Sequence, residues 1–247
     1  MLEINQVHLS LGRLKVLNGL SLSVPAGQRH AVIGPNGAGK TTLFNLLSGR
    51  YRPQHGRVVF DGRDITGLPP HRINRLGLAR SFQITNVFPG LSVFENVRQV
   101  VLARRGVRFD FLRRVDGFTQ VADETMTVLG RIRLAGKRDV LAGELSYGEQ
   151  RALEIGLTIA SQPKLVLLDE PTAGMSADET REAIRLIDEV TRDHTLLIIE
   201  HDMEVVFSLA DAITVINYGE ILASGPPEEI RGHAKVREAY LGDRCLA

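Results

Sequence analysis

Short apolar runs alternate along this chain with longer segments whose apolar residues recur at helical spacing. The short runs are typical of buried strands, and the longer segments are typical of amphipathic helices. Strands and helices that alternate in this way indicate an α/β fold with a largely parallel central sheet. The runs that we expect to form this sheet are residues 29–33, 165–168, 195–200 and 212–216.

Other short runs predict an antiparallel β layer beside the central sheet. Residues 1–24 contain two strand-like segments on either side of Gly12, and residues 58–60 form another apolar run. Such short segments around a glycine turn are typical of antiparallel strands. Asn217-Tyr-Gly-Glu220 has the composition of a tight hairpin turn, which leads into a strand over residues 221–224.

A helical insertion is expected between two parts of one core. Residues 85–143 are rich in Arg and carry few strand signals. We therefore expect one domain, 1–247, with a core formed by residues 1–84 and 144–247 and a helical subdomain formed by residues 85–143. A Ser followed three positions later by Glu, the pattern of a capping box at a helix start, supports this reading. The pattern occurs at Ser92 with Glu95, at Ser146 with Glu149 and at Ser176 with Glu179.

Composition excludes several classes of protein. The 247 residues carry 30 Lys and Arg against 29 Asp and Glu, for a net charge of +1, and 43% are hydrophobic. This is the profile of a soluble globular chain, and it provides no global attraction to nucleic acid. No run approaches the roughly 18 apolar residues that cross a bilayer. The start at Met1 also lacks the features of a secretory signal, so we expect a cytoplasmic chain without a nucleic-acid partner. Cys245 is the single cysteine and is expected to have no structural role.

A glycine-rich segment predicts a phosphate-binding loop. Gly34-Pro-Asn-Gly-Ala-Gly-Lys40-Thr41 matches the pattern Gly-x4-Gly-Lys-Ser/Thr and lies between a predicted strand and a predicted helix. Its glycines let backbone N–H groups surround phosphate oxygens, and the helix directs the positive end of its dipole at the anion. We expect Lys40 to reach the β- and γ-phosphates and the Thr41 hydroxyl to bind Mg²⁺.

Carboxylates end another apolar strand, at Asp169 and Glu170. Taken alone, this pattern also fits a core strand with solvated charges at its tip. In open α/β sheets, however, ligands bind beyond the carboxyl ends of the strands, which favours a place near the phosphate loop. Asp169 is then expected to hold Mg²⁺, and Glu170 to accept a proton from the water that attacks the γ-phosphate.

Two further polar residues have comparable positions. His201 directly follows the apolar run 195–200, so we expect it at the same edge of the sheet. Gln83 precedes the helical subdomain and is placed to contact Mg²⁺ or the attacking water. A lone His or Gln is more often structural, but the neighbouring phosphate loop favours a functional role for both.

Together these motifs resemble the ATP-binding subunits of ABC transporters, over nearly the whole chain. Leu145-Ser-Tyr-Gly-Glu149 is decisive, because it resembles that family's signature motif, most often Leu-Ser-Gly-Gly-Gln. The same segment also fits a capped helix start, whose free N–H groups suit a phosphate. The resemblance implies an ATPase with the α/β P-loop NTPase core of ABC ATPases, with a parallel sheet, an antiparallel β layer and an inserted α-helical subdomain.

The resemblance also implies the roles of individual residues. Two subunits of this family pack head to tail, so that the signature of one completes the ATP site on the other. It implies that ATP and Mg²⁺ are the cofactors, that Glu170 is the general base and that His201 senses the γ-phosphate. Lys40 and Gln83 are the other catalytic residues, and Thr41, Gln83 and Asp169 bind Mg²⁺. The implied ATP-binding residues are Leu11, Val16, Gly34, Pro35, Asn36, Gly37, Ala38, Gly39, Lys40, Thr41, Thr42, Ser146, Gly148 and Glu149.

Three residues depart from the family pattern. Leu11 stands where the family usually has an aromatic residue that stacks on adenine, so we expect ordinary ATP affinity and weak base selectivity. Tyr147 replaces the first glycine of the signature, which puts close backbone approach in doubt at that position. Ser176 stands where many relatives have Asp, which leaves the contact of that loop across the dimer open.

Several strings narrow the resemblance to importers of branched-chain and other hydrophobic amino acids. The partners implied are an identical or paralogous ATPase subunit, two integral membrane permease subunits and, indirectly, a periplasmic substrate-binding protein. The chain would then lie on the cytoplasmic face of the inner membrane as a peripheral subunit. The strings are residues 146–156, 173–175, 199–203 and 238–242.

Other functions share part of this pattern. Urea or short-chain amide importers share much of it, and lipopolysaccharide exporters share less. A non-transport ABC ATPase is an alternative of another class, although such relatives usually carry long coiled-coil insertions or a second cassette. A P-loop phosphotransferase of the kinase type is a further alternative, in which the signature motif would have no role.

Two surface features have open interpretations. Val87, Phe88, Leu91 and Phe94 fit either a dock for a permease helix or the packing of the helical subdomain. Arg104, Arg105, Arg108, Arg113 and Arg114 fit either a solvated face or a contact with anionic lipid headgroups.

Overall fold

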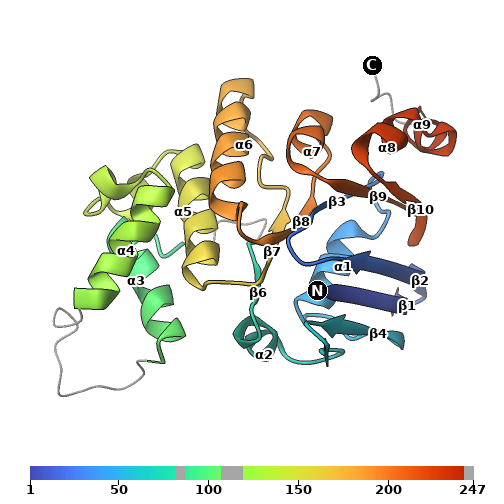
Figure 1. Cartoon of the computed structure of the whole chain (residues 1–247), viewed down its shortest axis with the longest axis horizontal. Helices are drawn as coiled ribbons and strands as arrows, with labels where there is room; N and C mark the ends of the chain where they lie inside the picture. The colour runs from blue at the N-terminus through green and yellow to red at the C-terminus, as the bar shows by residue number, and fades with distance from the viewer. Residues whose placement is uncertain (82–86, 107–118, 242–247) are drawn as a thin grey trace. The chain divides into compact units, whose positions relative to one another are not determined.

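The computed structural model describes residues 1–81, 87–106 and 119–241. They form two compact units, which we call the core unit and the helical unit (Figure 1). The core unit comprises Met1–Arg80, Lys164–Glu170 and Asp193–Ala247, and the helical unit comprises Ser81–Pro163 and Pro171–Arg192. No helix in the described ranges is long and apolar enough to cross a membrane.

The predicted antiparallel layer is present in the core unit. In the described part of the chain it is a four-stranded sheet with the order β2-β1-β4-β5. The first two strands flank Gly12, whose φ of 63° permits the turn. The strands are β1 (Leu2–Leu11), β2 (Leu14–Val24), β4 (His55–Phe60) and β5 (Arg63–Asp64).

The predicted central sheet is also present in the core unit. Its described strands have the order β10-β9-β3-β8-β7-β6, and every neighbouring pair is parallel except β9 with β10. Tyr218 and Gly219 have φ values of 48° and 79° in the hairpin turn between those two strands, as expected for such a turn. The strands are β3 (Arg29–Ile33), β6 (Leu78–Arg80), β7 (Leu165–Asp169), β8 (Thr195–Ile199), β9 (Ala212–Asn217) and β10 (Glu220–Gly225).

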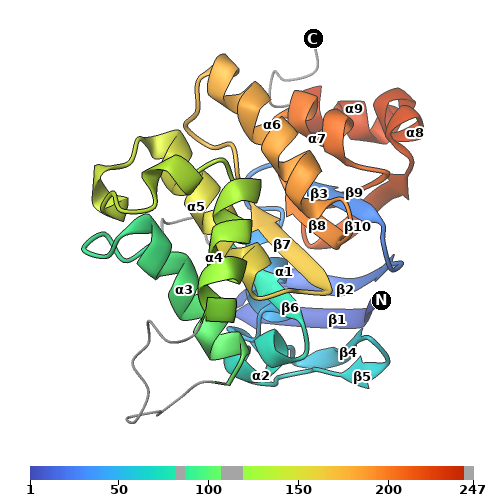
Figure 2. The same cartoon turned by 60° about the vertical axis from the view of Figure 1, so that its left-hand side comes forward.

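Period-two alternation places one face of the central sheet in the main hydrophobic core. Val32, Leu167 and Leu197 belong to the same buried cluster as Phe44 on α1 and the inward residues of the antiparallel layer. Helices α7, α8 and α9 lie on the other side of the central sheet from that layer in both ribbon views (Figures 1 and 2). The helices are α1 (Lys40–Leu47), α2 (Pro70–Arg75), α7 (Met203–Leu209), α8 (Pro227–Gly232) and α9 (Ala234–Leu241).

The helical unit extends beyond the predicted insertion, residues 85–143. Helix α5 packs against α3, α4 and α6, so that all of these helices share one compact unit. Because this grouping rests on contacts, the functional boundary at residues 85–143 stays a prediction. The helices are α3 (Val93–Arg104), α4 (Thr119–Arg131), α5 (Tyr147–Ala160) and α6 (Ala177–Thr191), with 3-10 turns η2 (Ala135–Lys137) and η3 (Ala142–Glu144).

The predicted helix starts are confirmed. Ser92, Ser146 and Ser176 are the N-cap residues of α3, α5 and α6. Both contacts of the capping box are formed at Ser146 and at Ser176. The capping box predicted at Ser92 is wrong in its second half, because the Glu95 carboxylate instead accepts a 2.6 Å bond from Arg98.

Candidate functional site

The phosphate loop connects β3 to α1 through glycines with positive φ. Gly34, Gly37 and Gly39 have φ values of 153°, 78° and 105°. Gly39 is the N-cap of α1 and offers no side chain to the first-turn N–H groups. Those groups are therefore oriented toward an incoming anion, which the helix dipole also favours.

Close packing explains why two of these positions need glycine. A Cβ built on Gly34 would lie 2.0 Å from the Ile216 carbonyl oxygen, and one on Gly39 would lie 2.9 Å from that of Val16. Neither distance is compatible with a side chain. The loop is thus held between β9 and β2, and Val16, a predicted ATP-binding residue, contacts it directly.

Lys40 lies inside the loop. Its ammonium donates to the carbonyl oxygens of Gly34 at 2.6 Å and Pro35 at 3.0 Å, and the residue is 7% exposed. Burial lowers the pKa of Lys40, while the charges of Glu170 and Asp169 act in the opposite direction. The structure therefore brings both predicted carboxylates into the electrostatic environment of the loop lysine.

The strand order explains where the two predicted carboxylates, Asp169 and Glu170, lie. Strands β3, β8 and β7 are parallel neighbours, so their carboxyl ends meet at one edge of the sheet. Asp169 ends β7, is fully buried and accepts a 2.7 Å bond from Arg80. The next residue, Glu170, has a φ of 47°, and its N–H donates to the Ile199 carbonyl at 2.9 Å. Glu170 thus directly follows the carboxyl end of β7.

His201 lies at the same edge, after β8. Its side chain is 63% exposed, and its Nδ1 lies 3.8 Å from Oε2 of the buried Glu200. The Glu200 carboxylate also accepts a 3.2 Å bond from the His201 N–H. The backbone is thus held by a buried acid, whereas the imidazole faces solvent and is accessible to a ligand.

The signature motif begins α5 in the helical unit. The Ser146 hydroxyl accepts from the Glu149 N–H at 3.4 Å, and the Glu149 carboxylate accepts from the Ser146 N–H at 3.1 Å. Hydrogen bonds from Lys137 and then from Ser146 lower the pKa of Glu149. A Cβ on Gly148 would meet the Glu179 carboxylate at 3.8 Å, an ordinary contact distance. The fold of one chain therefore does not explain a glycine at this position.

Some of the other predicted residues lie in the part of the chain that the structure describes, and some lie outside it. Leu11 ends β1 and is 43% exposed beside the β1–β2 turn. Thr41 is exposed at the start of α1, and Thr42 is half-buried. Gln83 lies outside the described residues, as do Arg108, Arg113, Arg114 and Cys245.

The donors that the sequence predicted for a metal are oxygen atoms. A Thr41 hydroxyl and an Asp169 carboxylate match the preference of Mg²⁺, which keeps several waters and binds phosphate oxygens besides a few protein ligands. Within the described ranges there is no group of three or more His, Cys, Asp or Glu that could hold a metal ion. The oxygen donors of Thr41 and Asp169 thus fit Mg²⁺ by their chemistry.

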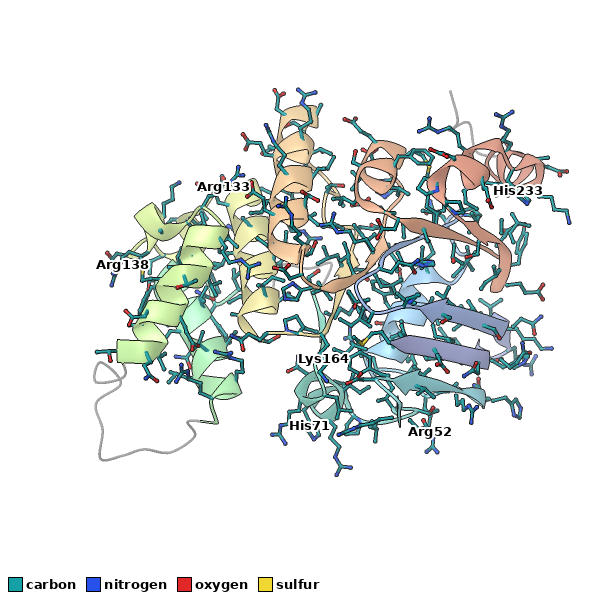
Figure 3. The ribbon with its side chains drawn as sticks, viewed as in Figure 1. Arg52, His71, Arg133, Arg138, Lys164 and His233 are labelled. Atoms are coloured by element: carbon teal, nitrogen blue, oxygen red, sulfur yellow. The ribbon has the colours of Figure 1, made fainter. Side chains whose placement is uncertain are left out.

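The residues of the two surface features predicted for the helical unit, the apolar group and the arginine cluster, differ in their exposure and contacts. Phe88 is 60% exposed, whereas the guanidinium of Arg138 lies 4.9 Å from the ring centre of Phe94. Arg104 and Arg105 both form ion pairs with Glu124, which neutralises part of the basic cluster. Figure 3 shows Arg138 on the outer surface of this unit.

Two features of the core unit were not predicted from the sequence. Arg80 ends the three-residue strand β6, which is too short to give a periodic signal. A cavity of about 610 Å³ also lies beside the phosphate loop, lined by Asn36 of the loop and by Lys235 and Glu238 of α9. Neither is recognisable from local pattern, because each depends on residues that are distant in the sequence.

Comparison with known families supports the resemblance that the motifs indicated. Residues 17–173 match the family model of the ABC transporter, and residues 220–245 match that of the branched-chain amino acid ATP-binding cassette transporter. The chain is 40% identical over 252 residues to the high-affinity branched-chain amino acid transport ATP-binding protein BraF of Pseudomonas aeruginosa, with 98% of each chain covered. It is 39% identical over 251 residues to LivG, the corresponding protein of Escherichia coli, again with 98% of each covered.

Solved structures agree with these sequence relatives. A nucleotide-free ATP-binding cassette from an ABC transporter matches with a TM-score of 0.84 and 29% identity, over 98% of this chain and 99% of that chain. The ADP conformation of an ATP-binding cassette of an ABC transporter matches with a TM-score of 0.85 and 27% identity, over the same shares. These findings confirm the resemblance and the fold class expected from the motifs.

Proposed function

The chain belongs to the ABC transporter family of ATP-binding ATPases, and from this premise we propose that it drives the import of branched-chain or other hydrophobic amino acids. The observation that carries this proposal is the 40% identity to BraF over 98% of both chains. In this role the chain lies on the cytoplasmic face of the inner membrane. Its partners are a second ATPase subunit, two permease subunits and, indirectly, a periplasmic binding protein.

The core unit supplies one half of each ATP site. The phosphate loop binds the phosphates through its N–H groups and Lys40, and the glycines at positions 34 and 39 keep the loop close to β9 and β2. Thr41 and Asp169, with Gln83, would hold Mg²⁺, which neutralises phosphate charge. Glu170 takes the proton of the attacking water, and the exposed imidazole of His201 contacts the γ-phosphate.

The helical unit supplies the other half, to the partner subunit. Ser146 and Gly148 lie at the start of α5, where the helix dipole favours a phosphate. In a head-to-tail dimer they complete the site on the partner's phosphate loop. Hydrolysis then requires two chains, and dimer closure becomes the step that drives the permease.

Mixing two inactive variants tests this shared site. Lys40→Ala damages the loop, and Ser146→Arg damages the signature, so each homodimer should be inactive. In a mixed dimer, one site combines both defects and the other combines an intact loop with an intact signature. We expect mixing to restore roughly a quarter of the wild-type ATPase activity, as random pairing of independent sites predicts. Mixtures that stay inactive while forming dimers would contradict the shared site.

Stimulation of ATPase activity tests the cargo. The complex with its permeases, reconstituted in proteoliposomes, is presented with binding proteins loaded with leucine, isoleucine or valine, or with urea or a short-chain amide. We expect the branched-chain amino acids to raise the ATPase rate. Stimulation by the amide-loaded protein alone would assign the chain to the amide importers instead.

A further inference from the structure

Arg80 connects two elements that carry opposite parts of the proposed Mg²⁺ site. Its Nη1 donates to Asn45 Oδ1 at 2.8 Å and to Ser48 Oγ at 3.0 Å, and its Nη2 donates to Asp169 Oδ2 at 2.7 Å. Asn45 lies on α1 and Ser48 is the C-cap of α1, whereas Asp169 is the last residue of β7. One guanidinium therefore joins the helix to the end of the strand.

This connection is buried. The side chains of Arg80 and Asp169 are 5% and 0% exposed, and the guanidinium carbon lies 5.7 Å from the ring centre of Phe44. Burial lowers the pKa of Arg80, while its hydrogen bond to Asp169 acts in the opposite direction. A buried ion pair of this kind contributes little net stability, because desolvation offsets the attraction. The geometry of this ion pair, and not its contribution to stability, therefore indicates its role.

We propose that Arg80 is a positioning residue that fixes the Asp169 carboxylate relative to α1, and thereby sets the spacing between the Asp169 and Thr41 oxygens that bind Mg²⁺. The inference rests on the proposed function, because it concerns the same metal. Thr41 lies in the first turn of α1, and Asn45 lies one turn further along the same helix. A helix is stiff over this length, so a bond at Asn45 also constrains Thr41.

The planar fork of Arg is what the arrangement needs. Its two terminal nitrogens reach acceptors on two different elements at fixed angles. A Lys keeps the positive charge but has a single ammonium, which cannot reproduce both directions. Arg80→Lys therefore separates the two explanations. If only the positive charge mattered, the lysine variant would behave as wild type, whereas a positioning role predicts weaker Mg²⁺ binding.

The experiment measures binding of a fluorescent, non-hydrolysable ATP analogue in EDTA and across a Mg²⁺ titration. In wild type we expect Mg²⁺ to tighten binding. In Arg80→Lys we expect the Mg²⁺ midpoint to rise about tenfold, the scale seen when partners of metal ligands are lost, with affinity in EDTA within about twofold. Lys164→Gln, at the opposite end of β7, is the matched control (Figure 3). It removes an exposed ion pair with Asp61 and should leave the midpoint unchanged.

Each outcome has a defined meaning. An unchanged midpoint in Arg80→Lys overturns the proposal, and so does an equal loss of affinity in EDTA, which would make Arg80 a support of the loop alone. If Arg80→Lys does not fold by circular dichroism, the double variant Asn45→Ala with Ser48→Ala removes the acceptors on α1 instead. The same shift is expected there, and its absence overturns the proposal. A wild type without any response to Mg²⁺ contradicts the metal site of the proposed function itself.

Discussion

The hydroxyl of Tyr147 donates a 2.7 Å hydrogen bond to the carbonyl oxygen of Ala173. One helical turn later on α5, Arg151 Nε donates to the Pro171 carbonyl at 3.1 Å, and its Nη1 pairs with Glu154 at 2.6 Å. Both bonds lie within the helical unit. They tie the start of the signature helix to the loop that leads to α6. The tyrosine that replaces a family glycine therefore has a specific partner in this chain.

Tyr147→Phe removes that hydroxyl and little else. We expect the free energy of unfolding to fall by about 1 kcal/mol or less, because the side chain is 47% exposed and Arg151 still holds the loop. The ATPase rate should fall roughly two- to fivefold with ATP affinity unchanged, since the loss affects positioning only. Tyr218→Phe, at a side chain that is 87% exposed, should match wild type in both assays. Equal rates in the two variants would exclude a role for the bond.

Gly148→Ala separates stability from activity. A methyl group meets only an ordinary contact within the chain, so the alanine should stabilise the helix by about 0.4–1 kcal/mol in chemical denaturation. If the signature backbone approaches a phosphate on the partner, the same methyl should reduce the ATPase rate by roughly tenfold or more. Gly130→Ala on α4, with open space around it, should stabilise without slowing turnover. An active Gly148→Ala variant would show that close approach is not needed.

Glu170→Gln tests the general base. The amide keeps the shape of the side chain but cannot accept a proton, so single-turnover hydrolysis should slow by roughly 10²–10⁴-fold. ATP affinity, measured by equilibrium binding, should stay within about twofold of wild type. The exposed Glu182→Gln on α6 serves as the control and should turn over normally. Near-normal turnover in Glu170→Gln would remove this residue from the proposed role.

His30 predicts an acid sensitivity of the fold. Its Nε2 lies 2.7 Å from Thr214 Oγ1 inside the central sheet, and burial lowers the pKa of His30 from 6.5 to about 4. Between these values the unfolded chain binds the proton and the folded chain does not, so stability falls as the pH drops from about 6.5 to about 4. The contribution is about 3 kcal/mol in total.

Denaturant unfolding of wild type and His30→Gln over this pH range isolates the effect. The glutamine keeps hydrogen-bonding groups but does not titrate. We expect the stability advantage of wild type over the variant to shrink by about 3 kcal/mol between neutral pH and pH 4. A difference that stays constant with pH would contradict the assignment.

Leu11→Tyr tests the adenine contact. Base stacking on an aromatic ring is worth roughly 1–3 kcal/mol, of which leucine recovers part by apolar burial. We expect a gain in ATP affinity of up to about tenfold, with stronger preference for ATP over GTP. Leu14→Tyr, on the opposite strand of the same hairpin and 68% exposed at present, should produce no gain. Unchanged affinity in Leu11→Tyr would refute the predicted position of the base.

The sequence alone determined the features that depend on neighbours along the chain. The strands β3, β7, β8 and β9 follow from runs of apolar residues, and the starts of α3, α5 and α6 follow from a Ser at the N-cap. The phosphate loop is likewise a local motif, because its glycines, lysine and threonine act within one turn of backbone. Such signals require no knowledge of the rest of the fold.

Tertiary structure alone decided which distant residues meet. Arg80 and Asp169 are 89 positions apart, and they pair because β6 and β7 are neighbours in the sheet. Position 34 requires glycine because the Ile216 carbonyl occupies the space that a side chain would need. Helices α5 and α6 join α3 and α4 because they bury shared faces. Strand order and helix packing minimise the free energy of the whole chain, and a short window of sequence does not contain the partners on which that minimum depends.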